Sequence, residues 1–313
     1  MQRETATAFG KLILLGEHAV VYGVPAIACA LDRVLSAELT WLETGPTELV
    51  LLSETRLATD DDLLGRAFGA LLRAGSGVPR APLRVRITGA LPPGMNLGFS
   101  AAAGVAAARA IESSAGGDAE AVKARADAWE RIFHGTPSGI DVAVAMHGGV
   151  VKFRRGESVR PLQPRCALHF CVGFSAMKPT STKSMVDAVA ALRERDAVAF
   201  QAVLDGIEAL MAPAERALLD GDLSVLGELM NRNHRLLARL ELSTEALESL
   251  CSSARAAGAF GAKLTGAGGG GAMVALAGAG GMVETERVAT RILDSWHEEG
   301  RSGFGVVVGL GRD

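Results

Sequence analysis

The sequence predicts an α+β protein of two layered domains, and three observations support this class. Signals for short strands and amphipathic helices alternate through both halves of the chain, without an internal repeat. At 313 residues and 49% hydrophobic content, the chain is long enough for two domains. A polar, proline-containing stretch near residues 156–164 (GESVRPLQP) separates the halves. We therefore expect one α+β domain over residues 1–158 and another over 159–313.

In the first half, strands and tight turns are expected over the first 30 or so residues, where KLILL, AVVYG and PAIACAL alternate with Gly, His and Pro. Further strands are expected in SAELTWLE, TELVLLSE and LRVRITGAL. Helices are expected over DDLLGRAFGALLRAG, from Ser100 to about Glu112, and from an N-cap at Asp118 to a stop at Gly135. A short helix and a strand follow in GIDVAVAMHGGVVKF.

In the second half, a buried strand is expected at CALHFCVGFSA, then several helices, a glycine loop, and strands at AMVALAG and GFGVVVGL. The loop GAGGGG, Gly266 to Gly271, matches G-x-G-x-x-G, with Glu284 near the distance of a ribose-binding acid. A strand-like segment follows it late in the chain, so a Rossmann dinucleotide site is excluded. Five glycines in six residues favour a ligand-facing loop over a simple surface connection.

Composition excludes several other classes. A formal net charge of −3 argues against a general nucleic-acid binder, and no G-x-x-x-x-G-K-[ST] motif indicates a P-loop NTPase. We expect no signal peptide, because Glu4, Glu17 and His18 interrupt any apolar region near the start, and no membrane span, because no run of about 18 apolar residues occurs. The net charge and the lack of such a run lead us to expect no nucleic-acid and no membrane partner. The four cysteines form no CxxC pair, so we expect reduced, mostly buried thiols in a cytoplasmic protein.

The stretch PPGMNLGFSAAAGVAAARAIE, from Pro92, places a loop before a helix of small residues. Such a loop is a ready anion site, because free backbone N–H groups and the helix dipole point the same way. Glycines and hydroxyls would suit a phosphate there, yet the loop carries Met95, Asn96 and Phe99. The sequence therefore predicts a phosphate site with an unusual lining.

Four separated segments together resemble the GHMP small-molecule kinases: GKLILLGEHAVVYGVPAIACALD, PPGMNLGFSAAAGVAAARA, ERIFHGTPSGIDVAVAMHGGVV and AKLTGAGGGGAMVAL. The first and third resemble the mevalonate kinase branch, and STKSMV with the helix before the glycine loop adds a fifth similar stretch. The resemblance spans the chain in the family's order. It implies an N-terminal ribosomal-protein-like α+β domain and a C-terminal ferredoxin-like domain.

The same resemblance implies an enzyme that uses ATP and Mg²⁺ to phosphorylate the primary hydroxyl of mevalonate, giving phosphomevalonate for isoprenoid synthesis. Transfer would be direct, and a homodimer is a family-level expectation. Two alternatives stay open: a GHMP kinase with another hydroxylated acceptor, such as a sugar or homoserine, and a non-catalytic homologue that senses a nucleotide or metabolite.

Matched to the family, Ser100 and Glu130 would hold Mg²⁺, whose preferred ligands are hard oxygens. Ser100 could otherwise be a simple helix N-cap, and Glu130 a solvated carboxylate at the edge of an apolar stripe. The resemblance implies that the nucleotide is bound by two sets of residues, which are Asn96, Leu97, Gly98, Phe99, Ser100 and Ala101 in the loop and Gly266, Gly268 and Gly269 in the glycine loop.

By the same resemblance, Asp141 would accept or orient the proton of the substrate hydroxyl. A carboxylate alone is a poor base for an alcohol, so Lys11 would pair with Asp141, lower the pKa of the alcohol and stabilise the transferring phosphoryl group. Without the resemblance, Asp141 could be a first-turn acid that complements a helix dipole, and Lys11 a surface lysine at a strand start.

The acceptor pocket implied by the resemblance comprises Glu17, His18, Gly139, Thr182 and Ala267. His18 could equally be a satisfied core histidine, and Thr182 could cap the helix TKSMVDAVAALRER. Three positions depart from the family's pattern: Met95 stands where the family has a small residue, Asn96 where it has Gly, and Phe99 where it has Ser. Asn96 tolerates left-handed backbone well, whereas the Phe99 ring either points into the core or narrows the nucleotide site.

Overall fold

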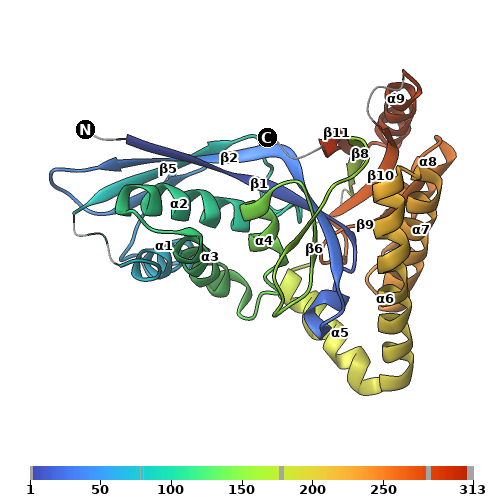
Figure 1. The fold of residues 1–313 in the computed structure, drawn as a ribbon, viewed down its shortest axis with the longest axis horizontal. Coiled ribbons are helices and arrows are strands. Elements are labelled where there is room, and N and C mark those ends of the chain that lie inside the picture. The colour runs from blue at the N-terminus through green and yellow to red at the C-terminus, as the bar shows by residue number, and fades with distance from the viewer. Residues whose placement is uncertain (1–2, 78, 80, 176–179, 280–282, 309–313) are drawn as a thin grey trace. The chain divides into compact units, whose positions relative to one another are not determined.

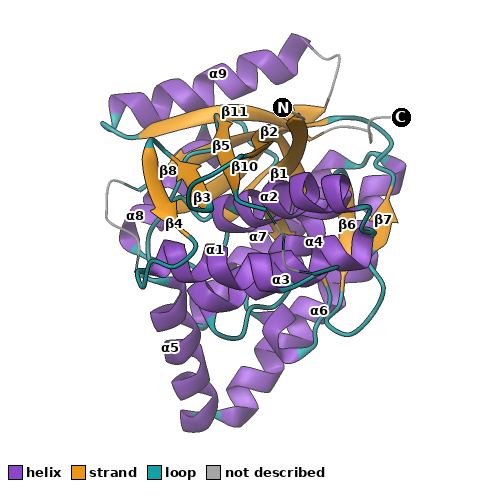
Figure 2. Cartoon of the chain, turned by 90° about the vertical axis from the view of Figure 1, so that its left-hand side faces the viewer, coloured by secondary structure: helices purple, strands orange, loops and turns teal. Residues whose placement is uncertain are grey.

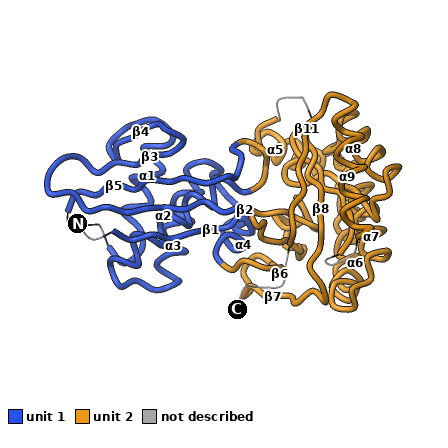
Figure 3. Tube along the Cα trace, turned by 90° about the horizontal axis from the view of Figure 1, so that it is seen from above, with its two compact units in different colours: residues 1–10, 33–93, 98–146 blue, residues 11–32, 94–97, 147–313 orange. Residues whose placement is uncertain are grey.

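The structure is a computed structural model, and it describes every residue except 1–2, 78, 80, 176–179, 280–282 and 309–313. The chain forms two compact units that alternate along the sequence (Figure 3). The first holds residues 1–10, 33–93 and 98–146, and the second holds 11–32, 94–97 and 147–313. The expected division into 1–158 and 159–313 stays a prediction.

The first unit combines strands and helices. Its elements are part of β1 (Arg3–Leu15), part of β2 (Ala26–Trp41), β3 (Glu48–Leu51), β4 (Glu54–Leu57), α1 (Leu63–Arg73), β5 (Leu83–Gly89), α2 (Phe99–Ala115), α3 (Ala119–His134) and α4 (Ile140–His147). The strands pair in the order β4-β3-β5-β2. β3 and β5 are parallel, and the other two pairs are antiparallel.

Helix α3 packs against both α1 and α2, and α2 also contacts β5 (Figures 1 and 2). The small residues of α2 are needed because α3 approaches closely: a Cβ on Gly104 would lie 2.6 Å from Cδ1 of Trp129. The predicted ends of α3 are confirmed. Asp118 caps it by accepting a hydrogen bond from the Ala121 N–H, and Gly135, with φ 66°, ends it.

The second unit contains the rest of β1 and β2 and the C-terminal half of the chain. Its other elements are the 3₁₀ helix η1 (Ala19–Tyr22), β6 (Val150–Phe153), β7 (Arg160–Leu162), β8 (Leu168–Phe174), α5 (Thr182–Arg195), α6 (Ala197–Asp220), α7 (Leu223–Arg239), α8 (Glu245–Ala256), β9 (Gly261–Leu264), β10 (Ala272–Ala279), α9 (Val283–Glu298) and β11 (Ser302–Val308). β2 pairs with β6, and β6 pairs with β7.

The strands β8, β9, β10 and β11 form an antiparallel sheet in the order β11-β8-β10-β9. Counted from β8, this is the order 4-1-3-2, with helices between the first and second strands and α9 between the third and fourth. That is the β-α-β-β-α-β arrangement of a ferredoxin-like domain, so the predicted α+β class is confirmed. Helices α7, α8 and α9 pack on this sheet.

The sequence pattern was wrong in one element of the first segment. AVVYG was expected among strands and tight turns, and its first four residues instead form η1. A short apolar run cannot by itself distinguish a strand from a buried turn of helix. Residues 176 and 309–310, which the pattern included in strands β8 and β11, lie outside the described residues.

Helix α6 is long and apolar enough to cross a membrane, by length and composition alone. A core helix passes the same test, and α6 buries an apolar face, with Phe200 and Ile207 among its buried residues, while it packs on α7. The expectation of mostly buried thiols is confirmed: Cys29, Cys171 and Cys251 are buried and unbridged. Burial raises the pKa of Cys251 to about 12, so this thiol is inert at neutral pH.

Candidate active site

The loop before α2 ends in a left-handed turn. Asn96 has φ 58° and Gly98, the N-cap residue of α2, has φ 76°. The alternative in which Ser100 is the helix N-cap is wrong, because Phe99 and Ser100 already lie in the first turn of α2. The loop is fixed in the second unit by a hydrogen bond of 2.8 Å from the Lys11 backbone N–H to the Leu97 carbonyl. Leu97 and Ala101 are buried, and the Phe99 ring is half-buried.

The two predicted Mg²⁺ ligands lie together in the first unit. The Ser100 hydroxyl donates a hydrogen bond of 2.5 Å to Oε1 of Glu130, from α2 to α3. Trp129 Nε1 holds the same serine, donating to its carbonyl at 3.0 Å and lying 3.3 Å from its hydroxyl. Glu130 is buried, so it is not the solvated carboxylate that its sequence position allowed. His134 Nε2 lies 3.6 Å from Glu130 Oε2.

This pair fits a Mg²⁺ ion chemically. A hydroxyl and a carboxylate are hard oxygen ligands, and Mg²⁺ in phosphoryl-transfer sites is held by one or two such groups together with substrate phosphates. Among the residues that the structure describes, no cluster of three His, Cys, Asp or Glu side chains could hold a metal by protein ligands alone.

Asp141 is the second residue of α4, and it lies in the helix's first turn half-buried. Gly139, with φ 91°, turns the chain into this helix, and its carbonyl accepts the first helical bond, from the Ala143 N–H at 3.0 Å. The carboxylate therefore sits where the helix dipole favours negative charge.

Lys11 and His18 lie at the two ends of one segment in the second unit. Lys11 is a buried residue of β1, only 5% exposed, which excludes a surface lysine. Glu17 is also buried, and its two carboxylate oxygens accept hydrogen bonds from Lys263 and Asn233. His18 follows in a left-handed conformation, φ 57°, immediately before η1.

The His18 ring is tied to the glycine loop. Its Nε2 lies 2.9 Å from the Ala267 carbonyl. Burial lowers the pKa of His18 below its ordinary value, and the hydrogen bond to Ala267 only partly opposes this. The ring is therefore neutral at neutral pH, and because a carbonyl can only accept, Nε2 carries the proton. Nδ1 is left as an acceptor.

Neighbouring segments hold the backbone of the glycine loop on several sides. The Gly269 N–H donates to the Leu242 carbonyl at 2.9 Å, and the Gly269 carbonyl accepts from the Thr180 N–H at 3.2 Å. The Gly271 N–H donates to the Ser175 hydroxyl at 3.0 Å. The backbone of the glycine loop is thus closely packed, as expected. The groups that it contacts belong to neighbouring segments of the same chain. A ligand-facing role stays a prediction.

The predicted nucleotide-binding glycines leave no room for side chains. A Cβ on Gly266 would lie 2.7 Å from the Asn96 Cβ, and one on Gly268 would lie 2.5 Å from the Leu242 carbonyl oxygen. A Cβ on Gly269 would meet the Met185 sulfur at 2.5 Å. Gly266 and Asn96 are therefore in close contact, and they belong to the two loops that the family resemblance assigns to the nucleotide.

We expect Gly266→Ala to lower the free energy of unfolding by about 2–3 kcal/mol, because it adds a clash at φ 81°. Urea unfolding measures this. Asn96→Gly on the same background removes the atom that the new Cβ meets, so it should restore part of the loss. If Gly266→Ala alone unfolds at the same urea concentration as the wild-type protein, the predicted clash with Asn96 does not occur.

Thr182 is the first residue of α5 and not its cap, because the Ser181 hydroxyl accepts the capping bond from the Ser184 N–H. The alternative of a capping role is therefore wrong, and Thr182 stays a predicted acceptor-pocket residue. Sequence reasoning missed Lys263, which is fully buried in β9 against Glu17. Its signal was a lone lysine in the apolar run GAKL.

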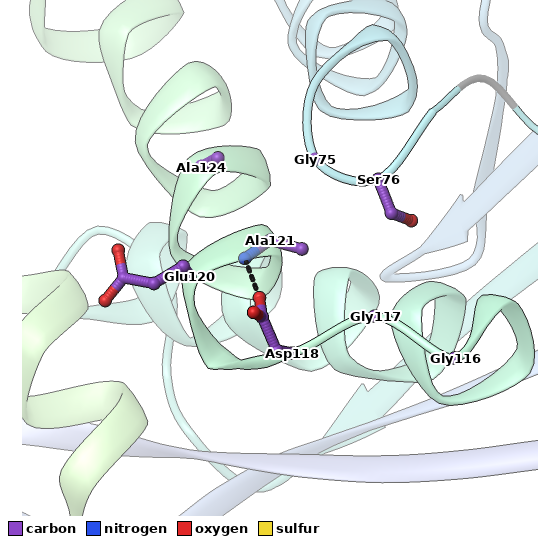
Figure 4. Close-up of a pocket in the computed structure, with 8 residues that line it drawn as sticks. All are labelled: Gly75, Ser76, Gly116, Gly117, Asp118, Glu120, Ala121 and Ala124. Atoms are coloured by element: carbon purple, nitrogen blue, oxygen red, sulfur yellow. Dashed lines mark hydrogen bonds between the residues drawn. The ribbon is translucent and has the colours of Figure 1, made fainter.

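A pocket of about 520 Å³ lies in the first unit (Figure 4). It opens where the ends of α1 and α2 meet the start of α3, and the dashed line in the figure is the Asp118 cap of α3. Behind it, Arg125 and Glu112 form a buried ion pair. No residue predicted to bind substrate, nucleotide or metal lines this pocket.

Comparison with known proteins decides the family. The model of the GHMP kinases N-terminal domain matches residues 62–149, and that of the GHMP kinases C-terminal domain matches 214–302. The chain is also 35% identical over 288 residues to a protein of Pyrococcus horikoshii named mevalonate kinase, covering 84% of this chain and 85% of that protein. The chain is a GHMP kinase.

Solved structures agree with this GHMP kinase fold. The crystal structure of L. major mevalonate kinase in complex with R-mevalonate superposes with a TM-score of 0.84 at 28% identity, covering 100% of this chain and 97% of that one. Lactococcus lactis galactokinase complexed with galactose reaches a TM-score of 0.80 at 16% identity, covering 99% and 94%, which shows the fold alone. Membership of this kinase family implies ATP as the phosphoryl donor.

Proposed function

We propose that this GHMP kinase transfers the γ-phosphoryl group of ATP to the primary hydroxyl of mevalonate, giving phosphomevalonate and ADP in isoprenoid synthesis. The observation that carries phosphoryl transfer is the convergence of the Ser100 hydroxyl and the buried Glu130 carboxylate at the start of α2. The choice of mevalonate is supported by the relatives named mevalonate kinase, which align with most of this chain.

The nucleotide is proposed to bind at the start of α2. Free backbone N–H groups at a helix N-terminus and the helix dipole both favour phosphate there. Ser100 and Glu130 are the proposed ligands of Mg²⁺, which neutralises charge on the phosphates of the bound nucleotide. Trp129 keeps the serine hydroxyl in place from behind. Gly266, Gly268 and Gly269 are proposed to line the nucleotide through their backbone, since the space that side chains would need there is filled by other parts of the chain.

Asp141 and Lys11 are proposed to perform the transfer step. Asp141 orients the acceptor hydroxyl and takes up its proton, and Lys11 supplies the positive charge that favours the alkoxide and the transferring phosphoryl group. A phosphoryl-transfer site needs little covalent chemistry from the protein, so positioning and charge account for most of the rate.

The resemblance to the family supports a proposed acceptor role for His18, Thr182, Gly139, Ala267 and Glu17. The neutral His18 ring presents Nδ1 as an acceptor, which suits a hydroxyl group of the substrate. Glu17 is fully engaged with Lys263 and Asn233, so it would act by holding its neighbours in place.

The acceptor alternatives remain testable. The galactokinase likeness shows that this fold does not by itself select mevalonate. The half-buried Phe99 ring beside the phosphate site is the feature that would favour a non-catalytic nucleotide sensor. Against a sensor stands the presence of Lys11, Ser100, Glu130 and Asp141 together. A cytoplasmic location stays a prediction from the cysteine content, and a homodimer stays a prediction from the family.

The deciding experiment measures ADP release by the purified protein from Mg²⁺-ATP, with mevalonate, phosphomevalonate, homoserine and galactose as separate acceptors. We expect release with mevalonate alone. Release with another acceptor only would keep the kinase and replace its substrate. Binding of ATP without release for any acceptor would overturn the proposed activity and favour the sensor.

A further inference from the structure

Strand β9 buries a lysine that none of the proposed chemical steps uses. Lys263 is fully buried, with an exposed fraction of 0%, among the otherwise apolar residues Gly261, Ala262 and Leu264. Lysine is almost never fully buried unless its charge is paired. The position therefore needs an account beyond packing.

Lys263 is the centre of a buried polar network, which we call the buried clasp: Lys263, Glu17 and Asn233. The ammonium group donates to Glu17 Oε1, to the Leu264 carbonyl at 2.6 Å and more weakly to the Ile13 carbonyl at 3.4 Å. The other oxygen of Glu17 accepts from Asn233 Nδ2 at 3.0 Å. The Lys263 ammonium thus donates three hydrogen bonds inside the protein, and both carboxylate oxygens of Glu17 accept one each.

Two other side chains join the same two segments that the clasp joins, which are residues 11–18 and 263–267. The Thr265 hydroxyl donates to the Ile13 carbonyl at 3.2 Å, and His18 Nε2 lies 2.9 Å from the Ala267 carbonyl. Together with Lys263, these bonds fasten residues 11–18 to residues 263–267 along their length. Lys11 and His18 stand at the two ends of the first segment, and the glycine loop begins in the second.

We infer that Lys263 is a positioning residue which, through Glu17 and the Ile13 carbonyl, fixes the segment carrying Lys11 and His18 relative to the glycine loop. The clasp thereby sets how the acceptor lies against the nucleotide's phosphates. This inference rests on the proposed function, since it assigns the clasp to the acceptor side of that same site.

The physical case is that an ion pair is a poor way to gain stability here. Burial lowers the pKa of Lys263, and the Glu17 carboxylate beside it is the main group that opposes this shift. The positive charge of Lys11 lowers the pKa of Lys263 further. A well-packed neutral pair would serve stability equally well. The ion pair instead contributes a defined geometry, because its hydrogen bonds hold residues 11–18 in place against residues 263–267.

The test compares Glu17→Gln, Lys263→Met and the double variant with the wild-type protein. Each single variant should lower Tm by about 10 °C, since it leaves a buried group unpaired. The double variant should recover most of that Tm. Its KM for mevalonate should nevertheless stay about ten- to hundredfold above wild type, because displacements near 1 Å are that costly. Its KM for ATP should be unchanged.

Glu112→Gln is the matched control, because Glu112 is equally buried and pairs with the buried Arg125 in the first unit. It should lower Tm and leave the KM for mevalonate unchanged. Thr265→Val is a milder second variant, which removes one parallel bond to Ile13 while keeping the side chain's shape. It should raise the KM for mevalonate about threefold at nearly wild-type Tm.

Wild-type kinetics in both the double variant and Thr265→Val would overturn the inference while leaving the proposed function intact. The inference would also be overturned if the KM for mevalonate rose as Tm fell in every variant, Glu112→Gln included. A wild-type protein that releases no ADP with mevalonate would instead overturn the proposed function, and with it the acceptor role of the clasp.

Discussion

Asp141→Asn is expected to lower kcat with mevalonate by about 10³-fold, within the range that a positioned acid or base contributes. Asparagine keeps the size and one oxygen of the side chain, so the hydroxyl can still be oriented. It cannot take up the proton, and it removes the negative charge that Lys11 is proposed to pair with. Steady-state ADP release over a range of mevalonate concentrations gives kcat and KM separately.

The fold and the nucleotide site should survive this change. Asp141 lies half-buried in the first turn of α4, where loss of its charge costs less than about 1 kcal/mol of helix stability. Asp127→Asn is the matched control, because Asp127 makes a surface ion pair with Lys123 on α3 and should leave kcat unchanged. An Asp141→Asn protein that retains most of its turnover would remove Asp141 from the transfer step.

Local chemistry made much of the fold predictable. The ends of α3 follow from Asp118 and Gly135, because a capping carboxylate and a left-handed glycine act on the residues next to them. The 3₁₀ helix at Ala19–Tyr22 was not predictable in this way. Its short apolar run is buried whether it forms a strand or a turn, and the choice depends on the segments packed around it.

In the candidate site, too, contacts between distant segments could not be predicted from local sequence. That Ser100 and Glu130 belong together came from a resemblance, and the structure brings the two side chains to hydrogen-bond distance across 30 positions of sequence. The alternative of an N-cap role for Ser100 was wrong for a related reason. Its hydroxyl is used by Glu130 and Trp129 on another helix, and local sequence contains no information on such a contact.

The glycine loop shows what a pattern leaves undetermined. Its run of glycines predicted backbone in close contact, and the contacts are present, but with Asn96, Leu242 and Met185 of the chain itself. Lys263 carried a weaker signal, a lone charge in an apolar strand. Its partner Glu17 lies 246 positions away, so only the folded chain could show the pair.

Glu130→Gln is expected to raise the concentration of free Mg²⁺ needed for half-maximal activity by at least about tenfold. Even groups that only orient metal ligands change metal affinity by about 10–100-fold when they are replaced. Glutamine keeps an oxygen for the Ser100 hydroxyl, so the link between α2 and α3 can persist. What it loses is the negative charge that a divalent cation requires. Activity is titrated against Mg²⁺ at saturating ATP and mevalonate.

Glu120→Gln is the control for this substitution, since Glu120 is an exposed carboxylate in the first turn of the same helix and should leave the Mg²⁺ dependence unchanged. Ser100→Ala should shift the dependence in the same direction as Glu130→Gln, but less, because a neutral hydroxyl is the weaker ligand. If Glu130→Gln lowers Tm while its Mg²⁺ titration matches wild type, then Glu130 is a structural partner of Ser100. In that case the metal would have to be held by other groups, and a site at the start of α2 would bind the nucleotide through its backbone alone.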